Sequence, residues 1–303
     1  MILIIIILIL DRKIKFTNMN SRILYYIFVV PISLLPYSIL YFFSDILYFI
    51  IYKIIKYRKN VVYTNLKNSF PEKSTKEVKE IMQKFYHHFC DVIVESCKGF
   101  TISEKELSKR VNIKNPELSN FYAKNDQNII FIAGHYNNWE ICAQACPIYS
   151  MHQCIGIYKP LKEKFLNDKI NLSRSKYGLR LISMLQVKKY FKEENQPKAI
   201  IFSTDQNPAS VKNAYWLDFL NQDTAVLFGA EKYAVEYNCP VIYASINKVK
   251  RGFYEVEYSL VTDNPKEENY GYITKDFTKR LENDIINQPQ YWLWSHKRWK
   301  HKR

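Results

Sequence analysis

An uncharged, strongly apolar stretch near the N-terminus constrains this chain more than any other feature of its sequence. Residues 23–44 carry no charged side chain and are rich in Ile, Leu, Tyr, Phe and Val, and the apolar run resumes after Asp45 over 46–52. A helix needs about 20 such residues to cross a bilayer. Because so long an uncharged stretch is unusual in soluble domains, the sequence predicts a membrane anchor over 23–55 rather than a buried core helix.

Two prolines divide this stretch. Pro31 and Pro36 predict a kinked helix or two shorter membrane-embedded pieces. Basic residues flank both ends of the stretch, so the positive-inside rule selects no orientation. The preceding residues 1–22 begin with an Ile- and Leu-rich run that is too short to span and is followed by no signal-peptide cleavage site. We therefore treat 1–22 as a leader of uncertain role, with Met19 as an alternative start.

From residue 60 onward, short apolar runs alternate with amphipathic stretches. The runs are typical of buried strands, and the stretches repeat their apolar residues at helical spacing. Strand and helix in alternation predict an α/β fold, with a mostly parallel central sheet flanked by helices and a membrane-embedded helical segment before it. This α/β domain, which follows the anchor, is expected over 60–303. Predicted strands cover 128–133, 154–158, 199–203, 241–246 and 253–261, and predicted helices cover 74–100, 162–177, 187–194, 225–237 and 274–287.

Glycine content excludes several large classes of enzyme. The chain has only 7 glycines and contains no GxGxxG, no GxxxxGK[ST] and no GxSxG. Those patterns form the phosphate-binding loops of dinucleotide-binding and P-loop folds and the nucleophile turn of α/β-hydrolases. The sequence is therefore not that of a Rossmann dehydrogenase, a P-loop NTPase or a standard serine hydrolase.

Charge and cysteine content narrow the partners and the compartment. Lys and Arg number 44 against 29 Asp and Glu, which gives a net charge of +15 and favours an anionic partner. Six cysteines without a CxxC pair do not form a disulfide framework and favour a reducing compartment. Cys142 and Cys146 could share a helix face and bind zinc, but no His at a metal-ligand spacing accompanies them. We therefore expect no metal and interpret both as small buried side chains.

A histidine directly after a predicted strand is the strongest catalytic candidate. His135 follows the strand 128–133 and Gly134, and the carboxyl ends of strands are where α/β sheets bind ligands. Asn137 or Asn138 can cap a helix that begins at Trp139, which places Glu140 in its first turn, close enough to touch the imidazole. A neighbouring carboxylate makes His a competent general base. Since no serine nucleophile is evident, the base would act on a substrate hydroxyl; a purely structural histidine is the alternative.

This segment also carries a family resemblance. Residues 134–140, Gly-His-Tyr-Asn-Asn-Trp-Glu, look like the HxxxxD/E block of glycerolipid and lipid A acyltransferases. From the apolar segment to the C-terminus the chain is similar to the late (secondary) acyltransferases of lipid A biosynthesis, within the lysophospholipid acyltransferase-like superfamily. Lys159 stands where that family usually has Arg, which weakens any bidentate phosphate contact there. The other similar blocks are 34–36, 57–62, 65–71, 158–161 with Arg174 and Gly178, 204–208, 219–225, 230–232 and 289–300.

The resemblance implies transfer of an acyl chain from acyl carrier protein to a hydroxyl of a lipid A precursor, without a cofactor. His135 would deprotonate the hydroxyl and Glu140 would hold the imidazole. Arg174 would stabilise the oxyanion, although its spacing fits an exposed surface charge equally well. The substrate-binding residues expected besides Arg174 are Lys159, Asp205 and Gln206.

The implied partners explain the basic charge. Acyl carrier protein, a phosphorylated lipid acceptor and the inner leaflet are all anionic, so Lys and Arg would attract each of them. The resemblance thus implies a bacterial inner-membrane protein whose catalytic domain faces the cytoplasm, with no nucleic-acid partner.

Three alternatives stay open on sequence grounds. The acceptor could be another glycolipid or an aminolipid, because the motifs report the reaction better than the acceptor. The chain could be a catalytically inactive membrane scaffold. It could also be a basic nucleic-acid-binding protein with 24 Tyr available for stacking, although these lie within apolar runs rather than among Lys and Arg in one patch.

Overall fold

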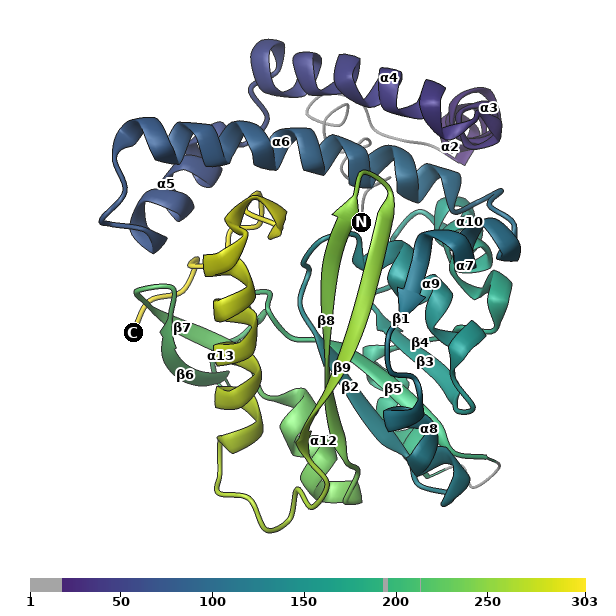
Figure 1. Cartoon of the computed structure of the whole chain (residues 1–303), viewed down its shortest axis with the longest axis vertical. Helices are drawn as coiled ribbons and strands as arrows, with labels where there is room; N and C mark the ends of the chain where they lie inside the picture. The colour runs from purple at the N-terminus through teal and green to yellow at the C-terminus, as the bar shows by residue number, and fades with distance from the viewer. Residues whose placement is uncertain (1–17, 193–195, 213) are drawn as a thin grey trace.

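A computed structural model describes residues 18–192, 196–212 and 214–303 (Figure 1). Residues 1–17, which make up most of the predicted leader 1–22, lie outside the described residues. The helix α2 spans Asn18–Leu24, so the predicted boundary between leader and anchor falls inside a helix.

A seven-stranded sheet forms the centre of the molecule, in the order β1-β9-β8-β2-β5-β3-β4. The strands β8, β2, β5, β3 and β4 run parallel to one another, β9 returns antiparallel to β8 as a hairpin, and β1 pairs parallel with β9. The predicted α/β fold with a mostly parallel sheet is therefore confirmed. The strands are β1 (Val111–Ile113), β2 (Ile129–Ala133), β3 (Gln153–Tyr158), β4 (Arg180–Ser183), β5 (Lys198–Ser203), β8 (Val241–Lys250) and β9 (Phe253–Thr262).

Helices cover both faces of this sheet and enclose two hydrophobic cores. α12 (Gly229–Tyr237) and α13 (Tyr272–Asn287) pack on one face, and α7 (Glu104–Arg110), α8 (Glu117–Lys124) and α9 (Trp139–Tyr149) pack on the other (Figure 1). Ile130 and Ile132 of β2 belong to the first core, whereas Ile129 and Phe131 belong to the second. A strand that is buried on both faces reads as a continuous apolar run, which is why this pattern identified β2.

One predicted helix begins too early. Residues 225–227, assigned to a helix over 225–237, belong instead to the antiparallel hairpin β6 (Ala214–Phe219) and β7 (Gln222–Leu227). Leu220 and Asn221 form the hairpin turn, both with positive φ. The other helices that follow the apolar segment are α5 (Lys59–Ser69), α6 (Thr75–Lys98), α10 (Lys164–Arg174), α11 (Val187–Phe191) and the short turns η3 (Ser175–Tyr177), η4 (Met184–Gln186) and η5 (Pro289–Tyr291).

The apolar N-terminal segment folds as two helical pieces that meet at Pro36. The first contains α2, η1 (Tyr25–Val29) and α3 (Val30–Leu34), and the second contains α4 (Tyr37–Tyr48) and η2 (Phe49–Ile54). Leu35 and Pro36 are extended between them, as expected for a residue pair that contains proline. By length and composition alone, Tyr37–Ile54 could cross a membrane. In the structure it lies alongside α6 (Figure 1).

Gly134, between β2 and the His135 loop, is required for close packing. Its φ lies outside the left-handed region, so the sharp turn expected from this glycine is not its main role. A Cβ at this position would lie 2.6 Å from Cδ1 of Leu281 on α13. The absence of a side chain therefore lets α13 approach the end of β2.

We expect Gly134→Ala to lower the free energy of unfolding by about 1–3 kcal/mol, the usual cost of overpacking a core. Leu281→Val shortens the side chain whose two methyl groups the new Cβ would meet, so the alanine should cost less in that background. Urea unfolding of the two single variants and the double variant measures this coupling. An equal cost of Gly134→Ala in both backgrounds would contradict the packing argument.

Candidate active site

Three parallel strands end at one edge of the sheet and bring the predicted site residues there. Ala133 of β2 pairs with Ser203 of β5, so the residues that follow the two strands emerge side by side. His135 follows β2, and Asp205 follows β5. Lys159 directly follows β3, the next strand beyond β5, and is exposed at the same edge.

Asp205 holds the His135 imidazole. Its Oδ1 lies 2.6 Å from His135 Nδ1, and its Oδ2 accepts the backbone N–H of His135 at 2.8 Å. The indole N–H of Trp292 donates to the same Oδ2 at 2.9 Å. Asp205 is nearly inaccessible, whereas 15% of the His135 side chain is exposed. Burial by itself raises the pKa of Asp205, but the adjacent His135 and these donors lower it to about 2.

Glu140 pairs with Arg174 rather than holding His135. Its carboxylate accepts two hydrogen bonds from the guanidinium, 2.9 Å from Nε and 2.6 Å from Nη2. Burial raises the pKa of Glu140, and the charge and hydrogen bonds of Arg174, with the charge of His135, lower it to about 2. The expectation that Glu140 holds the imidazole is therefore corrected. Glu140 lies in the first turn of α9 and contacts Arg174, the last residue of α10, while Asp205, which follows β5, supplies the carboxylate at His135.

The loop between His135 and α9 is fixed by two asparagines. Asn137 adopts the left-handed conformation, with φ of 53°, and donates from its amide to the carbonyl of Ile246. Asn138 caps α9 by accepting the N–H of Ile141, which confirms one of the two predicted caps. The Asn138 amide donates to buried Glu95 of α6 at 2.6 Å, so α6 also positions this loop.

The C-terminal segment completes the site, although none of its residues was among the predicted site residues. Trp292 binds Asp205, and Tyr136, next to His135, forms a β-bridge with Trp292. His296 and Arg298 lie near enough to interact electrostatically with Asp205. Burial lowers the pKa of His296 to about 4, so this imidazole is neutral at physiological pH. The signal that pointed to these residues was the block 289–300, although sequence alone did not place them beside His135.

Gln206 follows Asp205 and is half-buried, so it also lies at this edge. Four of the predicted site residues thus follow strands that end at one edge of the sheet: His135, Asp205, Gln206 and Lys159. The other two, Glu140 and Arg174, form an ion pair at the start of α9.

An apolar cavity of about 90 Å³ opens beside the site, between the sheet and α9. Ala133 and Ser203, at the ends of β2 and β5, line it together with Trp139, whose ring centre lies 5.2 Å from that of His135. Cys142 and Cys146 also line it, which agrees with their interpretation as small buried side chains. The cavity can therefore hold an apolar group close to the imidazole.

Within 18–192, 196–212 and 214–303, no three His, Cys, Asp or Glu side chains gather in a way that could hold a metal ion. The six cysteines are all free and buried.

One family model matches almost the whole sequence. The bacterial lipid A biosynthesis acyltransferase family matches residues 10–301. The chain belongs to this family. A search of curated proteins found no match. Membership of this family identifies the protein as an acyltransferase of lipid A biosynthesis and confirms the family resemblance found in the sequence. The family also implies a lipid acceptor.

The two low pKa values predict how stability depends on pH. The carboxyl groups of Glu140 and Asp205 have a pKa of about 2 in the folded protein and about 4 in the unfolded chain. The stability they provide is therefore present above about pH 5 and is lost as the pH falls toward 2. We expect the stability gap between the wild type and Asp205→Asn, measured by urea unfolding, to shrink over this range. A gap that stays constant would show that Asp205 has an ordinary pKa in the folded protein.

Proposed function

We propose that this protein transfers an acyl chain from acyl carrier protein to a hydroxyl of a lipid A precursor, with His135 as the general base. The observation that carries the proposal is the contact between His135 Nδ1 and Asp205. Because a carboxylate can only accept, the proton of the neutral imidazole is on Nδ1, and Nε2 then has a free lone pair. Such a nitrogen at the ligand-binding edge of the sheet can accept the proton of a substrate hydroxyl.

The reaction then follows from this tautomer. Nε2 takes the hydroxyl proton while the substrate oxygen attacks the thioester carbonyl. The tetrahedral intermediate collapses, the C–S bond breaks, and the imidazolium returns its proton to the departing thiolate. The products are an ester and a thiol, and Asp205 stabilises the transient imidazolium.

Arg174, Gln206 and Lys159 are proposed to bind substrate. Glu140, which interacts electrostatically with His135, fixes the Arg174 guanidinium in two hydrogen bonds, and we propose that this positive charge stabilises the oxyanion. In this proposal Glu140 is a positioning residue that acts through Arg174. Lys159 is exposed at the edge of the site and offers a positive charge to a phosphate of the acceptor.

The apolar cavity is proposed to hold the acyl chain of the donor. Its lining is almost wholly apolar. Trp139, one of the lining residues, contacts the His135 ring edge to face. A chain in this cavity would present its thioester to Nε2. The net charge of +15 would attract the acidic carrier protein and the anionic surface of the inner membrane, with the catalytic domain in the cytoplasm.

We expect Asp205→Asn to lower kcat by about 10²–10⁴, because the imidazole loses its orienting charge. His135→Ala should abolish turnover with the fold retained. Glu140→Gln is the matched control, since it also removes one buried carboxylate but leaves His135 and Asp205 in contact. It should reduce kcat less than Asp205→Asn does.

The measurement is single-turnover transfer from acyl carrier protein to a lipid A precursor, with products weighed by mass spectrometry. A larger loss in Glu140→Gln than in Asp205→Asn would return the orienting role to Glu140. Full transfer activity in His135→Ala would overturn the proposed mechanism, whereas absence of transfer in the wild type would favour a scaffold. Transfer to another glycolipid or an aminolipid alone would keep the mechanism and change the acceptor.

A substitution in the cavity should change chain-length preference. Ala143 lines the cavity from α9, and leucine is compatible with a helix there. We expect Ala143→Leu to lower transfer of long chains about tenfold or more relative to short chains, because the larger side chain fills the space. Competition between two donors in one reaction supplies an internal control. An unchanged ratio would place the acyl chain elsewhere.

A further inference from the structure

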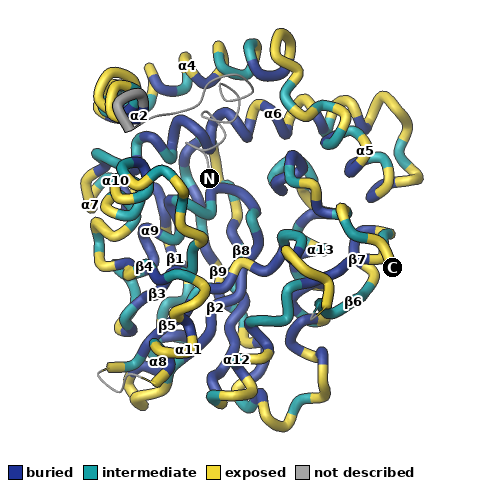
Figure 2. The backbone as a smooth tube through the Cα atoms, turned by 180° about the vertical axis from the view of Figure 1, so that it is seen from behind, coloured by how far each residue is buried: buried dark blue, intermediate teal, exposed yellow. Residues whose placement is uncertain are grey.

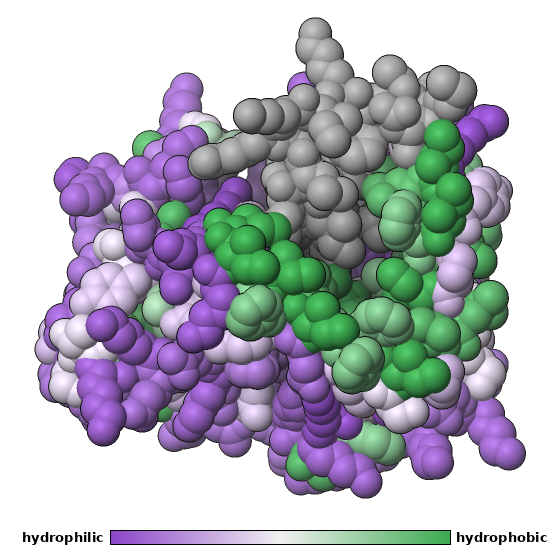
Figure 3. Space-filling view, turned by 90° about the horizontal axis from the view of Figure 1, so that it is seen from above, coloured by the Kyte–Doolittle hydropathy of each residue, from purple (hydrophilic) through white to green (hydrophobic). Residues whose placement is uncertain are grey.

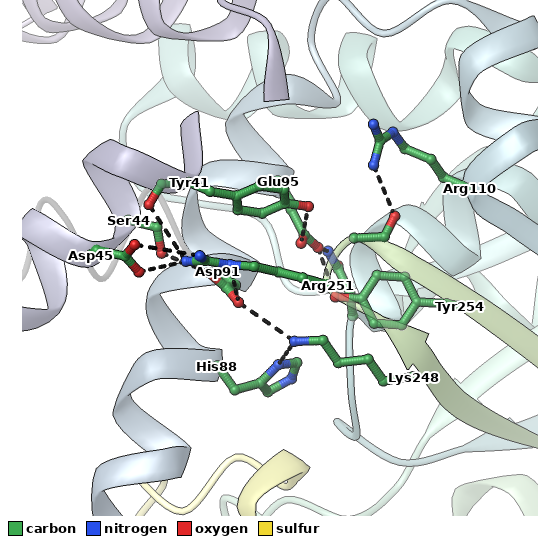
Figure 4. Close-up of polar contacts among 12 residues, drawn as sticks. Tyr41, Ser44, Asp45, His88, Asp91, Glu95, Arg110, Lys248, Arg251 and Tyr254 are labelled. Carbon is green, nitrogen blue, oxygen red and sulfur yellow. Dashed lines mark hydrogen bonds and ion pairs between the residues drawn. The ribbon is translucent and has the colours of Figure 1, made fainter. Parts of the chain in front are cut away.

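The helix Tyr37–Ile54 is fastened along its length to the catalytic domain. Tyr41 donates to Glu95 at 2.9 Å and Ser44 donates to Asp91 at 2.8 Å, both on α6 (Figure 4). Asp45 pairs with Arg251, at the tip of the β8–β9 hairpin, at 2.6 Å. These polar contacts lie in the middle of the helix, where a bilayer-spanning helix would be surrounded by lipid.

The partners of this helix form a charged cluster in which Asp91 and Glu95 are buried and Arg251 is partly exposed. Asp91 holds Arg251 and also Lys248, 3.5 Å from its carboxylate (Figure 4). Glu95 accepts from Tyr254 and Asn138 besides Tyr41, and burial raises its pKa. Charges paired in this way cannot separate from one another in hydrocarbon without a large penalty. If this helix crossed the bilayer, these partners on α6 and on the hairpin would have to enter it as well.

Contacts also hold both ends of the segment. Before the helix, Lys98 of α6 donates to the carbonyl of Leu35 at 2.9 Å, and Thr101 donates to the carbonyl of Ser33. Toward its other end, the ring of Tyr48 stacks on that of His87 with a centroid distance of 3.4 Å, and the ring of Tyr52 packs on that of Tyr86 of α6 at 5.1 Å. The helix therefore lies flat on α6 from one end to the other.

The opposite face of the same segment is apolar and exposed. Figure 2 shows buried positions of α4 on the side toward α6 and exposed positions on the outer side. Viewed from above, hydrophobic side chains gather over this layer (Figure 3). Phe42 is 63% exposed and Phe28, on the first helical piece, is 55% exposed. The exposed apolar side chains of the two pieces are Ile23, Tyr26, Ile27, Phe28, Leu34, Ile39, Phe42, Phe43, Ile46, Phe49 and Ile54.

We infer that the two helical pieces over 21–54 lie in the plane of an anionic lipid surface, with this apolar face in the acyl boundary, and that Tyr37–Ile54 does not cross the bilayer. An amphipathic segment docked on its own domain binds membranes in this way. Exposed Lys53, Lys56 and Arg58 follow the apolar face and supply the charge that anionic headgroups attract. The inference rests on the membrane location proposed above and adds the orientation.

This orientation also places the active site. α6 lies between α4 and the carboxyl edge of the sheet, and Glu95 contacts both Tyr41 of α4 and Asn138 of the His135 loop. The site therefore lies directly beneath the lipid-facing layer, where a lipid acceptor can reach it without leaving the membrane surface.

Depth measurements on four single-cysteine variants test the inference. Ile39→Cys, Phe42→Cys, Ile46→Cys and Phe49→Cys follow one exposed helix face, and the native cysteines are buried and protected from labelling. Each variant of the full chain carries a fluorophore and binds vesicles of phosphatidylglycerol and phosphatidylethanolamine with quenchers at known depths. Met151→Cys, exposed before β3 at the far edge of the sheet, is the matched control.

We expect all four probes to report one shallow depth within a few ångströms, while the control is not quenched. We also expect binding to weaken at least tenfold when phosphatidylcholine replaces the anionic lipid. A spanning helix would instead separate positions 39 and 49 by about 15 Å of depth, which would overturn the inference. Absence of quenching on all four probes would also overturn it and would indicate that another protein surface covers this face. Acyl transfer to a detergent-dispersed acceptor, assayed on the same samples, tests the proposed function separately.

Discussion

The candidate site depends on a single buried carboxylate that several parts of the chain must satisfy at once. Asp205 is almost fully removed from solvent, and a buried charge is stable only when donors surround it. Those donors come from the His135 ring, the His135 backbone and the indole of Trp292, near the C-terminus. Forming the site therefore requires β2, β5 and the C-terminal segment to be in place together. The same contacts set the tautomer of His135.

The structure also connects the apolar segment to this site through few side chains. Glu95 on α6 accepts from Tyr41 of α4, from Tyr254 of β9 and from Asn138, which caps α9. Asn138 and His135 belong to one short loop. The docking of the apolar segment and the shape of the His135 loop thus share one carboxylate, so this segment is structurally coupled to the candidate site.

Local patterns in the sequence predicted most of the sheet but not the partner of its histidine. The run 128–133 predicted β2 because both of its faces are buried, and Asn138 caps α9 as its position suggested. Glu140 was expected at His135 because it is near in sequence. The actual partner, Asp205, follows β5. It reaches His135 only because β5 pairs with β2 and lies between β2 and β3 in the sheet. Strand order depends on long-range packing, which residue spacing does not report.

The tautomer of His135 is the most direct test of this account. Nuclear magnetic resonance of ¹⁵N-histidine-labelled protein distinguishes a protonated Nδ1 from a protonated Nε2, with His135→Ala identifying the signal. We expect the proton on Nδ1 at neutral pH, a change of that signal in Asp205→Asn, and much less change in Glu140→Gln. A proton on Nε2 in the wild type, or an imidazole that responds to Glu140 and not to Asp205, would contradict the account.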